Sequence, residues 1–165
     1  MNEQFRRATA AIPELFHRLI TSEPFLEKGI AAQKGKSGVY AFFENDVPVH
    51  VGRTRNLGGR LRGHITKSHF SASFAFKRTR REKNVVATYV TAGSRAALVK
   101  EAEFEAEFFR QIGLVKLIHV RFVEIADPIA QYLLELYAHL TRIAFRQVRD
   151  PLTDEFRSCQ FRKRL

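Results

Sequence analysis

The sequence predicts an α/β protein of the α+β kind, with a small, mostly antiparallel three-stranded sheet flanked by helices and an N-terminal helical extension. Two short runs of β-forming residues flank a turn at 44–48, and a third run alternates apolar and polar residues at 118–125. Elsewhere the apolar residues recur at helical spacing. At 165 residues, 45% of them hydrophobic, the chain is long enough for one domain with its own core, and fifteen Phe with no Trp make that core Phe-rich.

Residues 4–33 carry the pattern of one or two helices. Apolar side chains recur there every three or four positions, and Ser22-Glu23-Pro24 predicts a break with Pro at the start of a new turn. A polar linker over 33–37 follows. We therefore expect a helical extension over 1–33, a main domain over 34–156 and a basic C-terminal tail over 157–165.

A hairpin and a helix are predicted next. The runs 38–43 and 49–51 have strand character, and Gly52 ends the second one. Helical character extends from Arg53 to His64, with Asn56 as the N-cap. Gly58 and Gly59 are poor helix formers, each costing about 1 kcal/mol relative to Ala. Either the helix begins after Asn56, or another backbone approaches closely at these glycines.

The middle of the chain is predicted to be mostly helical. Residues 73–81 form a basic helix with Phe74 and Phe76 partly buried, and 85–90 is ambiguous between strand and loop. A long helix is expected from Ser94 to about Ile112, with Gly113 as its stop.

The last strand, over 118–125, is followed by a helix that begins near Pro128. Its apolar residues form a helical stripe that we expect to face the core, and Glu135 lies at the flank of that stripe. Glu135 is therefore free to face either a functional site or water. The stripe consists of Ile129, Tyr132, Leu133, Leu136, Tyr137, Leu140 and Ile143.

The charge distribution predicts a polyanionic partner. The formal net charge is +11, and no acid interrupts the basic residues between Val47 and Arg81. A field of one sign attracts nucleic acid, whereas a surface kept only for solubility normally mixes signs. Besides Arg60, the candidate nucleic-acid-binding residues of this stretch are Arg53, Arg55, Arg62, Lys67, Lys77, Arg78, Arg80 and Arg81.

Four side chains with complementary chemistry are expected to converge beside the hairpin. They are Tyr40, His50, Arg60 and His64, and the last two lie four residues apart on one helix face. A phenol and imidazoles can carry protons, and a guanidinium can neutralise phosphate charge. These are the groups that phosphodiester hydrolysis requires.

The order of these residues resembles the GIY-YIG endonuclease superfamily. The matching motifs are Gly38-Val39-Tyr40, then His50-Val51-Gly52, then Arg60 and His64. The resemblance implies a Glu on a later helix as ligand of one divalent metal ion, Mg²⁺ or Mn²⁺, and Glu135 matches it. It also implies that Tyr40 or His50 activates water, that Arg60 stabilises the phosphorane charge and that His64 assists proton transfer.

The chain departs from the family pattern at two points. His50 stands where the family has its second motif Tyr, and no Asn follows Asn84, so Asp150, Thr153 or Asp154 takes the place of the late Asn. The expected function is a metal-dependent endonuclease that acts on DNA. The alternatives are a non-catalytic nucleic-acid-binding module on the same fold and a nuclease directed at RNA.

Other classes of protein fit the sequence less well. A single cysteine, Cys159, excludes an internal disulfide and a thiolate zinc cluster. We expect a cytoplasmic protein with no membrane partner, because the N-terminus lacks the apolar core of a signal peptide and no apolar run reaches membrane-spanning length.

Overall fold

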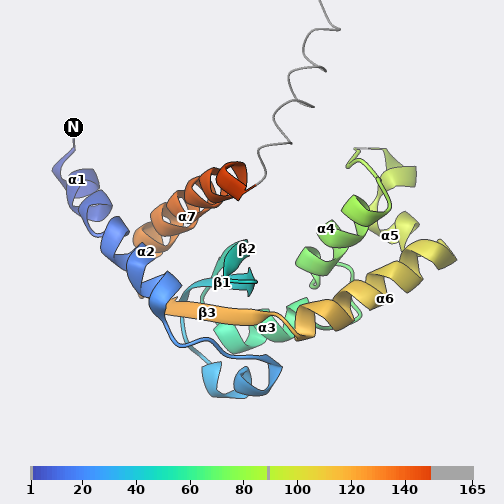
Figure 1. Cartoon of the computed structure of the whole chain (residues 1–165), viewed down its shortest axis with the longest axis horizontal. Coiled ribbons are helices and arrows are strands. Elements are labelled where there is room, and N and C mark those ends of the chain that lie inside the picture. The colour runs from blue at the N-terminus through green and yellow to red at the C-terminus, as the bar shows by residue number, and fades with distance from the viewer. Residues whose placement is uncertain (1, 89, 150–165) are drawn as a thin grey trace, which may run out of the picture.

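A three-stranded antiparallel sheet forms the centre of the molecule, as the sequence predicts (Figure 1). The computed structural model describes residues 2–88 and 90–149. The strands are β1 (Gly38–Glu44), β2 (Val47–Thr54) and β3 (His119–Glu124), in the order β2-β1-β3. Asn45 and Asp46 form the hairpin turn with φ of 51° and 59°, a conformation that their short polar side chains tolerate.

Strand β1 is buried on both faces because helices cover both sides of the sheet. Tyr40 and Phe42 point into a core built with the helices that follow the hairpin. The alternate residues Val39, Ala41 and Phe43 point into a second core on the opposite face. Figure 1 shows α1 (Glu3–Ala10), α2 (Ile12–Thr21) and α7 (Pro128–Arg149) on that opposite side.

Helices α3 (Leu57–His64), α4 (Ser73–Glu82) and α6 (Ala102–Lys116) build the core around Tyr40 and Phe42. The 3-10 turns are η1 (Glu27–Gly29), η2 (Ala31–Gln33) and η3 (Thr91–Gly93), and a short helix α5 (Arg95–Leu98) precedes α6. The helical extension contains two helices, α1 and α2, which are divided at Ala11, and the predicted break at 22–24 follows the end of α2. Its second helix is part of the core, because Ile12 and Leu19 are buried against the sheet and α7.

Three predicted helical boundaries differ from the structure. Residues 24–33 contain a β-bridge from Phe25 to Val120 and two 3-10 turns instead of a further α-helix. The predicted helix over 94–112 is two helices, because Glu101 adopts an extended conformation with ψ of 117° between them. Gly113 does not stop α6, which continues to Lys116, since a glycine costs a long helix only about 1 kcal/mol. Residues 85–88 belong to no strand.

The apolar stripe predicted to face the core from α7 is mostly exposed. Ile129, Tyr132, Leu136 and Leu140 expose between 51% and 60% of their surface. The narrower face that contains Gln131, Leu134 and Ala138 is buried instead, because this face of α7 packs against the sheet. The side chain of Ile143 lies outside the described residues, as do residues 150–165, which include Asp150, Thr153, Asp154, Cys159 and the basic tail.

Within the ranges 2–88 and 90–149, no helix combines the length and apolar character needed to cross a membrane.

Candidate active site

The hydroxyl of Tyr40 is the centre of the candidate site. Tyr40 lies in the middle of β1 and is fully buried. Its oxygen lies 3.2 Å from Arg60 Nε and 2.7 Å from His64 Nε2. An arginine can only donate, so the phenol oxygen accepts from Arg60, and the Tyr40 hydroxyl shares its second hydrogen bond with His64 Nε2. The structure therefore brings together three of the side chains that the sequence selects.

Helix α3 positions two of these groups. Arg60 and His64 lie one turn apart on the helix face that contacts β1. The Oδ1 atom of Asn56 accepts a hydrogen bond from the amide of Gly59 at 3.1 Å, so Asn56 is the predicted N-cap. A Cβ atom on Gly58 would lie 3.1 Å from the backbone of Lys34. Gly58 is thus explained by a close approach of the preceding linker, one of the two alternatives left by the sequence, whereas a Cβ atom on Gly59 would lie 2.8 Å from the side chain of the N-cap Asn56.

Gly52 makes room for the phenol. It is paired directly with Tyr40 across the β1–β2 ladder. A Cβ atom at position 52 would lie 2.5 Å from the Tyr40 hydroxyl, closer than real Cβ contacts. The glycine of the second motif is therefore required by packing, because the tyrosine of the first motif lies across it.

Burial controls the protonation of the two proton-carrying groups. Burial, with a smaller contribution from the Arg60 charge, lowers the pKa of His64 from 6.5 to about 3. His64 is therefore neutral at neutral pH. Burial also raises the pKa of Tyr40, against the opposing charge and hydrogen bond of Arg60. His64 Nδ1 is buried and has no hydrogen-bond partner among the described residues.

Arg60 links the phenol to the start of α4. Its Nη2 donates to the hydroxyl of Ser73 at 3.1 Å and its Nη1 to the carbonyl of Ser71 at 3.5 Å. The guanidinium is partly exposed, whereas Tyr40 and His64 are fully buried. Ser73 was not selected from the sequence, because its contact with Arg60 joins two separate helices. In the sequence, the position of Ser73 at the start of a predicted helix is the local feature that points to it.

His50 lies in an aromatic stack beside these groups. Its ring packs on Phe74 with centroids 4.8 Å apart and on Phe42 at 5.7 Å. The rings of His50 and His64 lie 5.3 Å apart and those of His50 and Tyr40 6.0 Å apart. The imidazole at the second motif position is thus adjacent to the hydrogen-bonded set.

Glu135 reaches the same region from α7, which packs against β2. Its charge contributes to the raised pKa of Tyr40, although less than burial does. Its Oε2 lies 3.1 Å from Arg53 Nε, and the Arg53 guanidinium carbon lies 3.3 Å from the centre of the Tyr132 ring. The carboxylate that the sequence assigns to a metal ion is therefore held by an arginine.

Whether Glu135 suits a metal ion depends on how many of the ion's ligands the protein itself must supply. No group of three or more His, Cys, Asp or Glu is placed to share an ion in the part of the chain that the structure describes. The described residues therefore contain no site in which three or more such side chains coordinate one ion. A single, partly exposed carboxylate suits Mg²⁺, which keeps several waters and takes substrate phosphate oxygens as further ligands.

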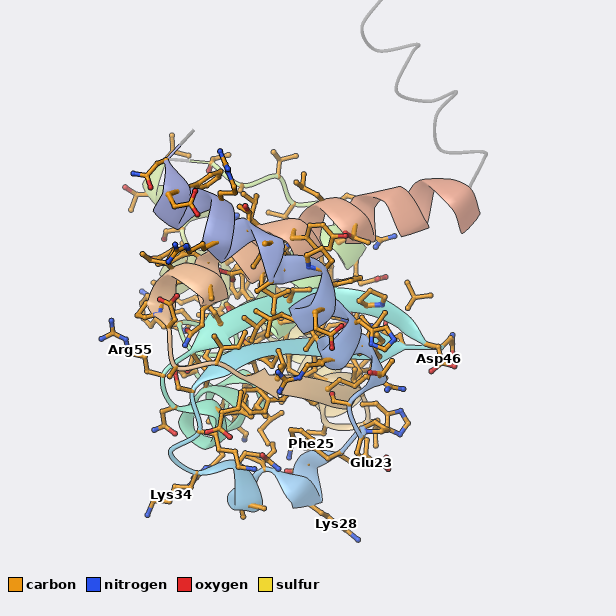
Figure 2. All side chains as sticks on the ribbon, turned by 90° about the vertical axis from the view of Figure 1, so that its left-hand side faces the viewer. Glu23, Phe25, Lys28, Lys34, Asp46 and Arg55 are labelled. Atoms are coloured by element: carbon orange, nitrogen blue, oxygen red, sulfur yellow. The ribbon has the colours of Figure 1, made fainter. Side chains whose placement is uncertain are left out.

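The basic residues predicted to bind nucleic acid divide into two groups. Arg53, Arg78 and Arg80 have partners within the fold. Arg78 donates to Glu44 at 2.5 Å and to Gln111 at 2.6 Å, and Arg80 donates to the carbonyl of Gly93 at 2.7 Å. The exposed group is Arg55, Arg62, Lys67, Lys77 and Arg81, of which Arg62 also donates to the carbonyl of Gly58 at 3.2 Å. In Figure 2 Arg55 projects outward at the end of the sheet opposite the hairpin turn at Asp46.

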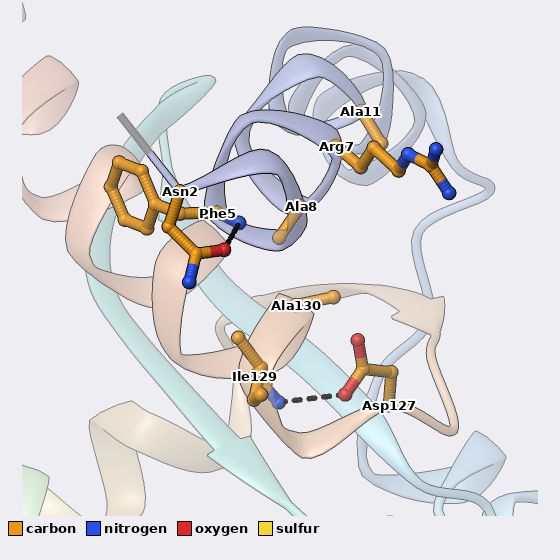
Figure 3. A pocket seen from close by; sticks show the side chains of 8 residues that line it. All are labelled: Asn2, Phe5, Arg7, Ala8, Ala11, Asp127, Ile129 and Ala130. Carbon is orange, nitrogen blue, oxygen red and sulfur yellow. Dashed lines mark hydrogen bonds between the residues drawn. The ribbon is translucent and has the colours of Figure 1, made fainter.

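A pocket of about 820 Å³ lies elsewhere, between α1 and the start of α7. Figure 3 shows Phe5 and Ile129 on its two walls, with Asp127 accepting a hydrogen bond from the Ile129 amide. No residue predicted for the active site is among its described lining residues.

Comparison of the chain with protein-family models, with curated proteins and with solved structures gave no match.

Proposed function

We propose that this chain is a metal-dependent endonuclease of the GIY-YIG type that hydrolyses phosphodiester bonds in DNA, with residues 34–156 as its nuclease domain. The observation that carries the proposal is the hydrogen-bonded set of Tyr40, Arg60 and His64, with Glu135 near enough for its charge to act on the phenol. A proton relay and a phosphate-binding cation are thereby combined beside the middle of β1, and the acid ligand comes from α7, which packs against β2.

Tyr40 is the proposed general base. Water gives a proton to the phenol oxygen while the phenol proton moves to His64 Nε2, along the 2.7 Å hydrogen bond. The resulting hydroxide forms the new bond to phosphorus. The bond to the leaving oxygen breaks, and that oxygen takes a proton from solvent. His64 ends the step as an imidazolium, and its proton returns to solvent afterwards.

Binding of phosphate prepares His64 for this step. In the free protein its pKa of about 3 disfavours protonation, and the Arg60 charge is one of the two causes. A phosphate beside Arg60 offsets that charge and therefore raises the pKa of His64. Arg60 also stabilises the negative charge that builds on the phosphoryl oxygens in the transition state. His50 is the second proton carrier, in the position where the family has a phenol.

Glu135 is the residue that would hold one Mg²⁺ or Mn²⁺. When bound, such an ion supplies positive charge for the leaving oxygen. The Arg53 ion pair occupies one oxygen of this carboxylate, so Arg53 and the metal ion compete for it. Together with the complete burial of Tyr40 and His64, this pairing favours the alternative function, a nucleic-acid-binding module without catalysis.

Incubation with supercoiled plasmid distinguishes the two functions. We expect nicking with Mg²⁺ or Mn²⁺ and none with chelator. Arg60→Ala should lower the nicking rate by about 10²-fold or more, whereas Arg6→Ala, at an exposed arginine of α1, should retain most of it. Tyr40→Phe should be as inactive as Arg60→Ala. Tight DNA binding without metal-dependent cleavage of plasmid, single-stranded DNA or RNA would support the binding module, and cleavage of RNA alone would assign an RNA nuclease.

A further inference from the structure

Phe70 lies in the loop between α3 and α4 and exposes 69% of its surface. Its ring centre lies 4.2 Å from that of His69. The two rings form a small aromatic surface on an otherwise polar loop. Isolated exposed aromatic residues are common on proteins, so its significance depends on how the loop is held and where it lies.

The loop is fixed by hydrogen bonds to its backbone. Arg95 Nη1 donates to the carbonyl of His69 at 3.0 Å and to that of Phe70 at 3.3 Å. The amide of Ala72 donates to the carbonyl of Ser68 at 2.8 Å. A preorganised backbone holds the Phe70 ring in solvent, and a ligand that packs on it does not have to order the loop first.

The same loop contacts the candidate active site. The carbonyl of Ser71, the next residue, accepts a hydrogen bond from Arg60. The exposed cations Arg62 and Lys67 lie on α3 and in the loop itself. An aromatic face next to a phosphate-binding arginine and further cations is the combination that binds a strand of nucleic acid, because the bases stack while the phosphates pair with the charges.

We propose that Phe70 is a stacking platform for an unpaired base next to the phosphate held by Arg60. This inference rests on the proposed function and specifies its substrate class: nucleic acid that is single-stranded or locally unpaired at the cleavage site. The bases of an intact duplex are stacked on each other and offer no free face to a side chain from outside. An unpaired base offers both faces.

The absence of Trp from the sequence gives a direct test. Phe70→Trp introduces a single tryptophan, and its fluorescence is measured during titration with three DNAs in the presence of chelator: a single strand, a perfect duplex and the same duplex with one bulged base. Phe5→Trp is the matched control, at a half-exposed position of α1, a helix that contacts α7 on the other side of the sheet. A fluorescein label on each DNA reports binding independently by anisotropy.

We expect the single strand and the bulged duplex to quench the tryptophan at position 70 and the perfect duplex to leave it nearly unchanged. The tryptophan at position 5 should respond to none of them. Phe70→Ala and Phe70→Leu should both weaken single-strand binding about tenfold, because each removes the aromatic face. Binding without quenching, or equal quenching by the perfect duplex, would overturn the inference and leave the proposed function standing. Failure of the wild type to bind any of the DNAs at low salt would overturn both.

Discussion

The buried hydrogen bond between Tyr40 and His64 connects the candidate site to the stability of the domain. Both side chains are fully buried, and the Tyr40 hydroxyl and His64 Nε2 are hydrogen-bonded at 2.7 Å. Leaving such groups unpaired costs about 1–3 kcal/mol each. The relay that we propose for proton transfer is therefore also part of the core, so variants of these residues require a stability measurement beside any activity assay.

Acid should destabilise the protein through His64. Its pKa is about 3 in the folded state and 6.5 in the unfolded chain. The unfolded state therefore binds a proton first as the pH falls, and stability is lost between pH 6.5 and 3. Between pH 7 and pH 5 the loss from this group is about 2 kcal/mol. Urea unfolding at several pH values should show it.

The control for this prediction is His64→Gln, which keeps a side chain able to accept from Tyr40 but cannot be protonated in this range. Its stability should change less between pH 7 and pH 5 than that of the wild type. Equal pH dependence in the two proteins would show that His64 is not the group responsible.

At the scale of the elements, the site depends on the register of β1 and β2. Tyr40 faces Gly52 across the ladder, and the ring fills the space that a side chain would occupy. A β-bulge between Phe42 and Phe43 shifts the pairing toward the turn, while the Tyr40–Gly52 pair keeps regular register. The hairpin thus positions the phenol by backbone geometry as well as by hydrogen bonds.

Gly52→Ala should destabilise the domain by roughly 1–3 kcal/mol, because the new methyl group overlaps the Tyr40 hydroxyl. The double variant Gly52→Ala/Tyr40→Phe should recover part of that loss, since the nearest of the overlapping atoms is then absent. Chemical denaturation of the four proteins of this cycle gives the coupling energy. Additive effects would mean that the two residues do not collide.

Arg53→Gln should strengthen metal binding at Glu135. The substitution removes the cation that is ion-paired to Glu135 and leaves the carboxylate available. Titration with Mn²⁺, followed by the electron paramagnetic resonance of the free ion, measures the affinity without any cleavage. We expect the Mn²⁺ affinity to increase about tenfold, which corresponds to the loss of a partly exposed ion pair.

Two matched variants make that experiment decisive. Arg55→Gln removes an exposed arginine two residues away and should leave Mn²⁺ affinity unchanged, whereas Glu135→Gln should abolish the site. If Glu135→Gln binds Mn²⁺ as well as the wild type, the metal ligand is assigned to the wrong residue. If Arg53→Gln alone has no effect, Arg53 does not compete with the ion.

The hairpin and helix α3 could be predicted from the sequence, whereas the buried face of α7 could not. The hairpin, Asn56 as N-cap and the spacing of Arg60 and His64 are local signals within short segments. The buried face of α7 was predicted wrongly, because its longest apolar stripe is exposed and a narrower face packs on the sheet. Periodicity defines the faces of a helix but does not say which face another element covers.

In the candidate site, too, contacts between separate elements could not be predicted from the sequence. Tyr40, Arg60 and His64 were selected from the sequence and do lie together. The pairing of Arg53 with Glu135 joins β2 to α7, and the contact of Arg60 with Ser73 joins α3 to α4. Contacts between separate elements leave no mark in the spacing of residues along the chain.

For the whole molecule, the distribution of positive charge determines which residues are free to bind a polyanion. Arg78 joins the hairpin to α6 through Glu44 and Gln111, so it belongs to the fold. The exposed set of Arg55, Arg62, Lys67, Lys77 and Arg81 remains available. Affinity for duplex DNA should fall steeply with salt, because each neutralised phosphate releases close to one counterion.

Charge reversal separates the two groups. Lys77→Glu combined with Arg81→Glu should weaken binding for all DNA sequences alike and leave stability nearly unchanged. Arg78→Glu should instead lower the free energy of unfolding by roughly 2 kcal/mol, because it removes hydrogen bonds of a charged group and places an acid beside Glu44. Anisotropy titrations at several salt concentrations and urea unfolding provide the two measurements. An affinity that hardly changes with salt would contradict the assignment of the exposed set to phosphate contacts.

The separation of the site residues along the chain has a consequence for the order of biosynthesis. Tyr40, Arg60, His64 and Ser73 come from β1, α3 and the start of α4, whereas Glu135 comes from α7, the last helix of the described chain. A ribosome therefore synthesises the residues that we propose to bind phosphate well before the acid. In the proposed function, a nascent chain that ends before α7 lacks the group that would hold the metal ion, so hydrolysis begins only after α7 has docked.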